Sequence, residues 1–408
     1  MSKRITYFYD QSVGNFEYST NHPMRPLRIK MAHELIVNYR LHKKMEMLTP
    51  EKATFEDIAA FHANDYVRFL EEVSSVKKKS QEIKGKMGKF NFNDDSPVFS
   101  GVYDFCRLTA GGTICSAQKI NEGRCDVAIN WSGGLHHAKR TEASGFCYTN
   151  DIVLGILELL KHNKRVMYID IDVHHGDGVE EAFYTSDRVM CVSFHKYGDF
   201  YPGTGNLMDQ GLYRGKGYSV NVPLNAGIDD HSYEVLFKKV VGKCVDTFQP
   251  SAIVLQSGAD SLSGDRLGEF NLTLEGHSSC VKFLQTLQIP LVVLGGGGYT
   301  IKNVARAWAY ETSVICGESI DRKIPFNQYY EHYGPDYTID VPESTMANKN
   351  SKEDLERIIM SVNENLRNVN LAPSVEIKAM PMGLLRDPSD YADESEDRDS
   401  VVYESLSE

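Results

Sequence analysis

Short apolar runs alternate with longer amphipathic segments through most of the chain. Each apolar run is bounded by turn residues and predicts a buried strand. These runs lie at 5–9, 126–131, 165–172, 189–195, 218–224, 252–256 and 290–294. Apolar side chains recur with helical spacing at 151–161, 179–184, 233–248 and 302–316. This alternation predicts an α/β protein whose strands run parallel, with helices on both faces of the sheet.

The C-terminal part of the chain has a different pattern. A last helix is predicted to begin near Ser351, because Ser351 and Asp354 resemble a capping box. Its apolar stripe consists of Leu355, Ile358, Ile359, Val362 and Leu366. Residues 387–408 are rich in Asp, Glu and Ser and contain few large aliphatic side chains, which predicts a disordered acidic tail. We therefore expect one domain over residues 1–373 and a tail over residues 374–408.

Composition is that of a soluble globular protein: 41% of the 408 residues are hydrophobic and 25% are charged. Apolar stretches are too short to cross a membrane, and the N-terminus does not resemble a signal peptide. The eight cysteines form no CxxC pair, which favours a reducing, intracellular compartment over a disulfide scaffold.

The charge balance indicates the kind of partner. A net charge of −12 argues against direct binding to DNA and suits a basic partner or substrate. One local exception is Lys77–Lys79, followed by Lys84, Lys86 and Lys89. A solvated loop is the simpler interpretation of these lysines, and a nuclear-import signal is the alternative.

The candidate chemistry begins directly after the apolar run at 165–169. Asp170, Asp172 and His174 alternate, so an extended chain would place them on one side of a strand end. Carboxylates and an imidazole that converge there favour a divalent cation. Asp260 supplies another carboxylate after a different strand. A catalytic zinc needs three protein ligands and one open position, which Asp172, His174 and Asp260 would provide.

Further reactive side chains follow other predicted strands. His136 and His137 lie in a glycine-rich loop, and Tyr299 follows four consecutive glycines. We expect His137 to act as general base and His136 as its neighbour for acid or electrostatic work. Asp170 and Asp177 would orient the two imidazoles. Tyr299 would donate to an oxyanion. The glycine run lacks the spacing of a phosphate loop.

Together these residues resemble the zinc-dependent histone deacetylases, and class I in particular. The resemblance extends roughly from Tyr7 to Arg367. It includes further motifs at 22–26, 130–139, 142–148, 193–197, 202–205 and 264–268. It implies the arginase–deacetylase fold, a single domain with a central, mostly parallel eight-stranded sheet. The implied activity is hydrolysis of acetyl-lysine in histone tails with release of acetate. Nuclear residence, corepressor partners and transcriptional repression are implied as well.

The resemblance also implies roles for residues beyond the metal site. An acyl-lysine channel would be lined by Gly145, Phe146, Tyr201 and Leu267, with Asp95 at its rim and Arg28 buried beneath the metal. A structural potassium ion would use Asp170, Asp172, His174, Ser193 and Phe194, partly through backbone carbonyls. An inositol polyphosphate would use Arg25, Arg266 and Lys302.

This sequence departs from the family pattern at three positions. Tyr201 stands where the channel usually has Phe, and its hydroxyl could alter acyl-chain preference or inhibitor fit. Glu269 replaces a small residue near the rim and would favour basic substrates. Glu17 would repel phosphate, so the inositol polyphosphate is allowed by the sequence but not expected.

Three alternatives stay open at this point. A binuclear manganese ureohydrolase would need more ligands, but Gly176 and Leu262 stand where they would be required. A deacetylase of small acetylated amines such as polyamines would use the same chemistry. A corepressor scaffold without activity is the third alternative, but such a scaffold would not need all of the predicted catalytic and metal-binding residues to be present. The ligand set also allows iron(II) in place of zinc.

Overall fold

The computed structural model describes residues 3–75, 81–367 and 369–370. Met1–Leu371 forms one compact unit, which contains the sheet and all of the candidate site residues. The acidic tail expected from residue 374 and the lysines Lys77–Lys79 lie outside the described residues. The proposed domain boundary at 373 therefore stays a prediction.

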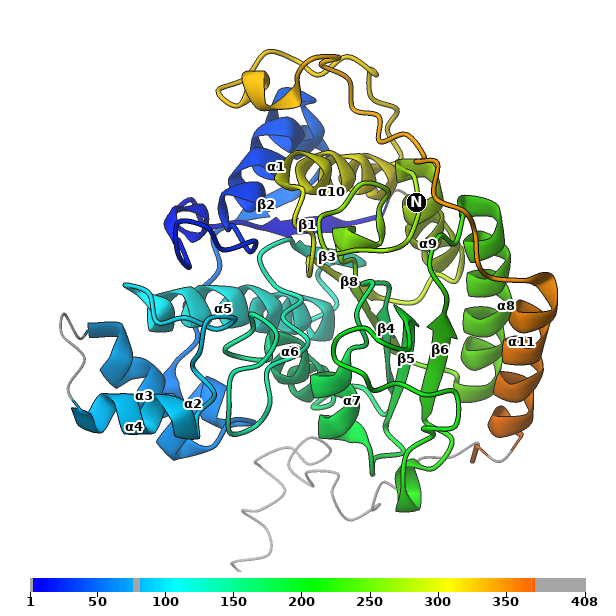
Figure 1. The fold of residues 1–408 in the computed structure, drawn as a ribbon, viewed down its shortest axis with the longest axis horizontal. Coiled ribbons are helices and arrows are strands. Elements are labelled where there is room, and N and C mark those ends of the chain that lie inside the picture. The colour runs from blue at the N-terminus through cyan, green and yellow to red at the C-terminus, as the bar shows by residue number, and fades with distance from the viewer. Residues whose placement is uncertain (1–2, 76–80, 368, 371–408) are drawn as a thin grey trace, which may run out of the picture. The chain divides into compact units, whose positions relative to one another are not determined.

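A single parallel sheet forms the centre of the fold (Figure 1). Its eight strands are arranged in the order β2-β1-β3-β8-β7-β4-β5-β6, and each neighbouring pair is parallel. Their bounds are β1 Ile5–Phe8, β2 Glu46–Leu48, β3 Val127–Asn130, β4 Val166–Asp170, β5 Val189–Lys196, β6 Ser219–Leu224, β7 Ala252–Gln256 and β8 Leu291–Leu294. The predicted strands are confirmed, and β2 is added at one edge.

Successive residues of a strand enter two different hydrophobic cores. In β4, Met167 and Ile169 pack on one face of the sheet, while Val166 and Tyr168 pack on the other. Because both faces are buried, the strands are continuous apolar runs. This explains why they could be recognised in the sequence.

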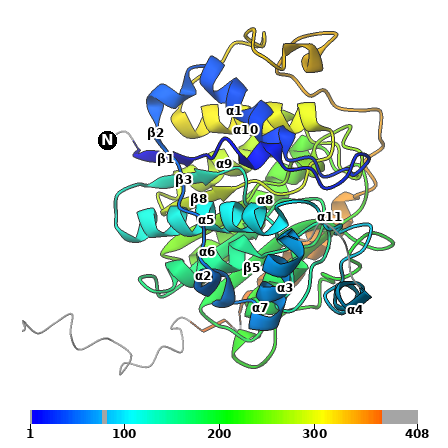
Figure 2. The ribbon, with the colours of Figure 1, turned by 90° about the vertical axis from the view of Figure 1, so that its left-hand side faces the viewer.

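Helices cover both faces of the sheet, as Figure 2 shows from the side. One face carries α1 (Leu27–Asn38), α8 (Asp230–Phe248), α9 (Leu274–Thr286) and α10 (Ile301–Cys316). The other carries α5 (Val102–Asn121), α6 (Asp151–Leu159) and α7 (Asp177–Phe183). This arrangement confirms the expected arginase–deacetylase architecture.

Four further helices complete the set that the structure describes. They are α2 (Phe55–Ala59), α3 (Asn64–Ser75), α4 (Gln81–Lys89) and α11 (Lys352–Leu366). The Ser351 side chain accepts a hydrogen bond from the Asp354 amide and so caps α11, which packs against α8 through its apolar stripe. Short 3-10 helices span Val13–Asn15, Leu41–Lys44, Tyr213–Gly215, Ala259–Ser261 and Tyr330–Tyr333. Among the described residues, none of the helices combines the length and apolarity that a membrane span requires.

The carboxyl ends of the parallel strands meet at one edge of the sheet. The loops that leave β3, β4, β5, β7 and β8 there carry most of the reactive residues predicted from the sequence. Ligand sites of open α/β sheets lie at this edge.

Candidate active site

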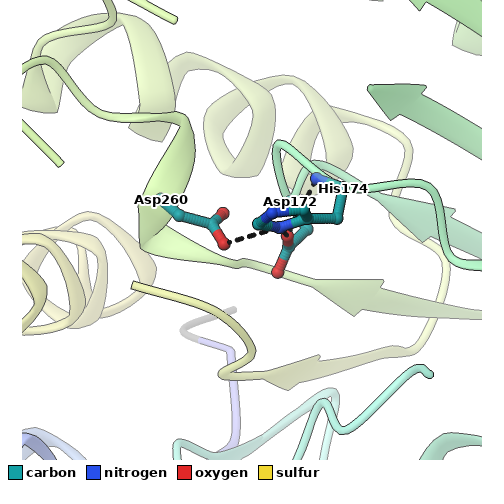
Figure 3. Close-up of side chains that lie close together, drawn as sticks. All are labelled: Asp172, His174 and Asp260. Atoms are coloured by element: carbon teal, nitrogen blue, oxygen red, sulfur yellow. Dashed lines mark hydrogen bonds and ion pairs between the residues drawn. The ribbon is translucent and has the colours of Figure 1, made fainter. Parts of the chain in front are cut away.

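A cluster of three buried side chains forms the centre of the site (Figure 3). Asp172 and His174 lie in the loop after β4, and Asp260 lies in the 3-10 turn after β7. His174 Nδ1 is 3.0 Å from Asp172 Oδ1 and 3.2 Å from Asp260 Oδ2. Their potential ligand atoms all lie within 4.8 Å of one another. Within the described part of the chain, no other group of His, Cys, Asp and Glu has this metal-binding geometry.

The local backbone differs from the extended strand that the alternation suggested. Strand β4 ends at Asp170, so Asp172 and His174 are positioned by a turn. The Asp172 amide donates to Asp170 Oδ1 and the His174 amide donates to Asp172 Oδ1, each at 3.0 Å. The Asp170 carboxylate bonds to His136 and does not belong to the group of potential metal-ligand atoms.

The electrostatics of the cluster fit a bound cation. Burial would raise the pKa of Asp172, but His136 and His174 hold the pKa of this carboxyl well below its usual value. Burial and the charge of Asp172 raise the pKa of Asp260. Two buried carboxylates of this kind carry full charge together only when positive charge lies between them. One nitrogen and two carboxylate ligands suit zinc or iron(II).

The two carboxylates are also held from outside the cluster. Asp172 Oδ2 accepts hydrogen bonds from Gln256 Nε2 and from the Gly297 amide, both at 2.8 Å. Asp260 Oδ1 accepts from the Val173 amide at 3.0 Å. These bonds fix the orientation of both carboxylates. Gln256 was not predicted as a site residue, although a polar residue at the end of the apolar run 252–256 is a signal for it.

Two histidine–aspartate pairs stand beside the cluster. His136 Nδ1 is 2.7 Å from Asp170 Oδ2, and His137 Nδ1 is 2.7 Å from Asp177 Oδ1. Burial would lower the pKa of His136, but Asp170 and its neighbour Asp172 outweigh burial and raise the pKa to about 9. Burial and the adjacent His136 lower the pKa of His137 to about 3, although Asp177 opposes them. The pairs therefore favour opposite protonation states.

Asp177, the aspartate of the second pair, has a further partner that was not predicted from the sequence. Lys139 Nζ lies 2.7 Å from Asp177 Oδ2. Burial would raise the pKa of Asp177, but His137 and Lys139 lower the pKa of this carboxyl. Asp177 therefore remains an anion that can orient His137.

The glycine run after β8 lets the backbone approach the cluster. A Cβ atom on Gly297 would lie 1.9 Å from Asp260 Oδ2, so only glycine fits there. Arg28 is buried below the run and donates to the carbonyl oxygens of Gly296 and Gly298. Tyr299 is buried as well, and burial holds its pKa well above 10, so the phenol remains a hydrogen-bond donor.

Tyr299 is positioned by a residue that sequence reasoning did not single out. Asp265 Oδ2 accepts from the amides of Tyr299 at 2.7 Å and Thr300 at 3.0 Å, and Asp265 Oδ1 accepts from the Leu267 amide at 3.0 Å. Asp265 lies in the glycine-flanked motif at 264–268, which is the sequence signal that could have identified it.

A pocket of about 320 Å³ leads from the surface to the cluster. Its lining residues are Asp95, His137, Gly145, Phe146, His174, Phe200, Tyr201, Leu267 and Tyr299. Phe200 was not expected as a lining residue, and its ring stacks on His174 with centroids 5.1 Å apart. The pocket walls are largely apolar, with the exposed Asp95 carboxylate at the surface and hydrogen-bonding groups at the bottom.

Other residues named from the sequence lie away from this pocket's lining. Ser193 and Phe194 lie on β5, where Ser193 is paired in register with Asp170. Among the side chains that an inositol polyphosphate would use, Arg25 donates to the Thr20 carbonyl and Lys302 donates to the Gly334 carbonyl. Arg266 is exposed in the loop after β7.

A buried Asp–His–Asp cluster, flanked by two histidine–aspartate dyads at the base of a pocket, has the residues that a metal-dependent hydrolase uses. A family model for the histone deacetylase domain matches residues 22–315. The chain belongs to the histone deacetylase family and groups with class I.

The similarity extends over nearly the whole chain. Probable histone deacetylase 1-B of Xenopus laevis is 54% identical over 400 residues, covering 98% of this chain and 83% of that protein. Type-1 histone deacetylase 1 of Dictyostelium discoideum is 52% identical over 401 residues, covering 98% and 80%. Histone deacetylase 1 of Homo sapiens is 54% identical over 379 residues, covering 93% and 78%.

Proposed function

We propose that this chain hydrolyses N6-acetyl-lysine in histone tails, releases acetate, and thereby contributes to chromatin-based repression of transcription. The observation that carries the proposal is the apolar-walled pocket with Asp95 at its surface and the Asp172–His174–Asp260 cluster at its base. An extended acyl-lysine side chain fits such a pocket, since the walls are apolar and the polar groups lie at its two ends.

Asp172, His174 and Asp260 would hold a single zinc ion. When bound, zinc supplies a Lewis acid that polarises the substrate carbonyl and makes water more acidic. The cluster supports one ion and not two, because Gly176 and Leu262 cannot serve as ligands for a second metal. This argues against the ureohydrolase alternative.

The chain's own residues then divide the proton transfers between them. His137 is bonded through Nδ1 to Asp177, so its Nε2 is the nitrogen left to accept a proton from the attacking water. Asp170 and Asp172 raise the pKa of His136, so this imidazole would supply positive charge or a proton beside the reacting amide. The Tyr299 hydroxyl donates to the oxyanion that develops on the carbonyl oxygen.

The rim favours a basic peptide. Asp95 lies at the mouth of the pocket and would accept the backbone N–H groups of the substrate. Glu269 is exposed two residues after Leu267, although Lys196 Nζ lies 3.8 Å from its carboxylate and offsets part of its charge, and the chain as a whole carries −12. Histone tails are basic, so the charges of enzyme and substrate are complementary.

Further ligands and partners belong to the same proposal. A structural potassium ion would lie between the ends of β4 and β5, at Asp170, Asp172, His174, Ser193 and Phe194. We expect corepressor subunits as partners and the nucleus as the main location, with no direct contact to DNA. Inositol polyphosphate at Arg25, Arg266 and Lys302 is not required by the proposal, since Glu17 opposes it.

The test is a comparison of substrates with the purified protein. We expect acetate release from an acetylated histone peptide, loss of this activity with a chelator, and inhibition by a hydroxamate. Acetylspermidine should be a much poorer substrate, and a preference for it would support the small-amine alternative. Absence of turnover on both substrates, with metal bound, would support the scaffold alternative.

A further inference from the structure

The hydroxyl of Tyr201 makes a contact that crosses between two loops at the mouth of the pocket. It lies 2.8 Å from Ser144 Oγ. The Tyr201 ring stands nearly perpendicular to the His137 ring, with centroids 5.0 Å apart, and 46% of the residue is exposed. The contact therefore lies between the solvent and the reactive groups.

Ser144 belongs to a segment that is firmly held. Ser144 and Cys147 exchange two backbone hydrogen bonds, of 3.0 and 2.8 Å, and so close a tight turn. Within this turn, Phe146 adopts a left-handed backbone conformation with φ of 68°. The Phe146 carbonyl accepts a hydrogen bond from the Tyr18 hydroxyl at 2.9 Å. A non-glycine residue keeps this conformation only where its surroundings fix it.

Tyr201 belongs to a segment whose two flanking glycines are loosely surrounded, although the Phe200 ring beside it stacks on His174. Gly198 and Gly203 flank it, with φ of 111° and 83°. A Cβ atom on either glycine would meet no other atom within 4 Å, so these positions are surrounded by open space. Glycine with positive φ and no packing around it gives the backbone little resistance to displacement.

We propose that Tyr201 determines specificity by tethering this glycine-flanked segment to the Ser144 turn. Phe200 and Tyr201 form one part of the pocket wall, and Gly145 and Phe146 form another. The Tyr201–Ser144 hydrogen bond fixes the distance between them and keeps the pocket narrow. The enzyme then selects an unbranched lysine side chain over thicker ligands. This inference rests on the proposed function of the pocket as an acyl-lysine channel.

Gly145 lies against both His137 and Tyr201. A Cβ atom there would lie 2.5 Å from His137 and 2.9 Å from the Tyr201 hydroxyl oxygen. The His137 ring and the Tyr201 hydroxyl together occupy the room that a side chain at this position would need. The tether and the glycine are consequently parts of the same narrow passage.

The test compares two hydroxamates that differ only in the linker, one an unbranched alkyl chain and the other a phenylene ring. Their Kd ratio would be measured for the metal-loaded wild-type protein, Tyr201→Phe, Ser144→Ala and the double variant. Each single variant should lower the preference for the alkyl linker by about three- to tenfold, and the double variant should lower it no further.

Tyr197→Phe is the matched control. The Tyr197 hydroxyl accepts a hydrogen bond from Asn206 within the same loop, but Tyr197 does not line the pocket. This variant should keep the wild-type Kd ratio. An effect of Tyr201→Phe without an effect of Ser144→Ala would overturn the tether, because the hydroxyl would then act on the ligand directly. Unchanged ratios in both variants would overturn it as well.

Amide hydrogen exchange separates this inference from the proposed function. Peptides covering 198–206 should exchange faster in Tyr201→Phe and in Ser144→Ala than in the wild-type protein, whether or not the protein turns over acetyl-lysine. Equal exchange rates would contradict the tether even in an active deacetylase. Faster exchange in a protein without deacetylase activity would refute the proposed function alone.

Discussion

The imidazoles of His136 and His137 lie with ring centroids 3.9 Å apart, yet they bond to different carboxylates, Asp170 and Asp177. Asp172 Oδ2 also lies 3.9 Å from His136 Nε2, so both ring nitrogens of His136 face a carboxylate. The positive charge of His136 disfavours the protonated form of His137. Adjacent residues of one type thereby obtain different protonation states, which general acid–base catalysis requires.

Replacing His137 with Ala should nearly abolish deacetylation, because this imidazole is the group placed to accept the proton. We expect turnover to fall by about 10²- to 10⁴-fold. The bound metal should stay, since His137 is not a ligand in the cluster. Kinetics on an acetylated histone peptide together with metal analysis would check both expectations. A variant that keeps its turnover would remove His137 from the role of base.

Tyr299→Phe removes the proposed oxyanion donor and leaves the ring in place. Turnover should decrease by roughly a hundredfold, with a much smaller change in KM, as when one oxyanion-hole donor is lost. Tyr337→Phe is a suitable control, because the Tyr337 hydroxyl contacts Glu331 away from the pocket. Wild-type turnover in Tyr299→Phe would remove Tyr299 from the role of oxyanion donor.

His62 makes stability depend on pH. It is buried, and its Nε2 accepts a hydrogen bond from the Asn150 amide at 2.9 Å. Burial lowers the pKa of His62 to about 4, below its usual 6.5. Between these values the unfolded chain binds a proton that the folded chain does not. Stability should therefore fall as the pH decreases from 6.5, by about 1.4 kcal/mol per pH unit for this group.

Urea unfolding at pH 7.0 and pH 5.5 would measure this dependence. The wild-type protein should lose about 1 kcal/mol more than His62→Gln over this interval. Titration of the metal ligands contributes equally to both proteins and cancels in the comparison. The exposed His332 provides a control, and His332→Gln should lose as much stability as the wild type. If His62→Gln loses as much stability as the wild-type protein, the pH dependence of stability comes from groups other than His62.

Strands and reactive loops could be predicted from the sequence because each carries a local signal. Strands buried on both faces are short apolar runs, and charged residues directly after them are conspicuous. Edge strand β2 carries no such signal, since it is three residues long and Met47 is partly exposed.

Several helices were missed because polar and small residues interrupt their apolar stripes. Helix α5 buries Thr109, Thr113 and Ser116, and it contains Gly111 where a Cβ atom would lie 2.0 Å from the Glu51 carbonyl oxygen. Helix α9 buries His277, which pairs with Glu311 of α10. Tertiary contacts satisfy these side chains, and hydrophobic periodicity does not record such contacts.

Residues that position other site residues were missed for a related reason. Asp265 acts on Tyr299 through backbone amides, and Gln256 acts on Asp172 from a neighbouring strand. An aspartate or a glutamine is not diagnostic of a catalytic site. Asp265 and Gln256 can therefore be identified only once the structure shows which residues they contact. The ligands and dyads, in contrast, could be inferred from residue type and spacing.

The most direct test of the metal centre is the metal content of Asp260→Asn after dialysis against a weak chelator. The wild-type protein and an Asp177→Asn control should each retain one ion per chain. Asp260→Asn should lose most of its metal, because loss of a ligand weakens binding by more than the about 10- to 100-fold typical of losing an outer partner. Full retention by Asp260→Asn would contradict the assignment of Asp172, His174 and Asp260 as the metal centre.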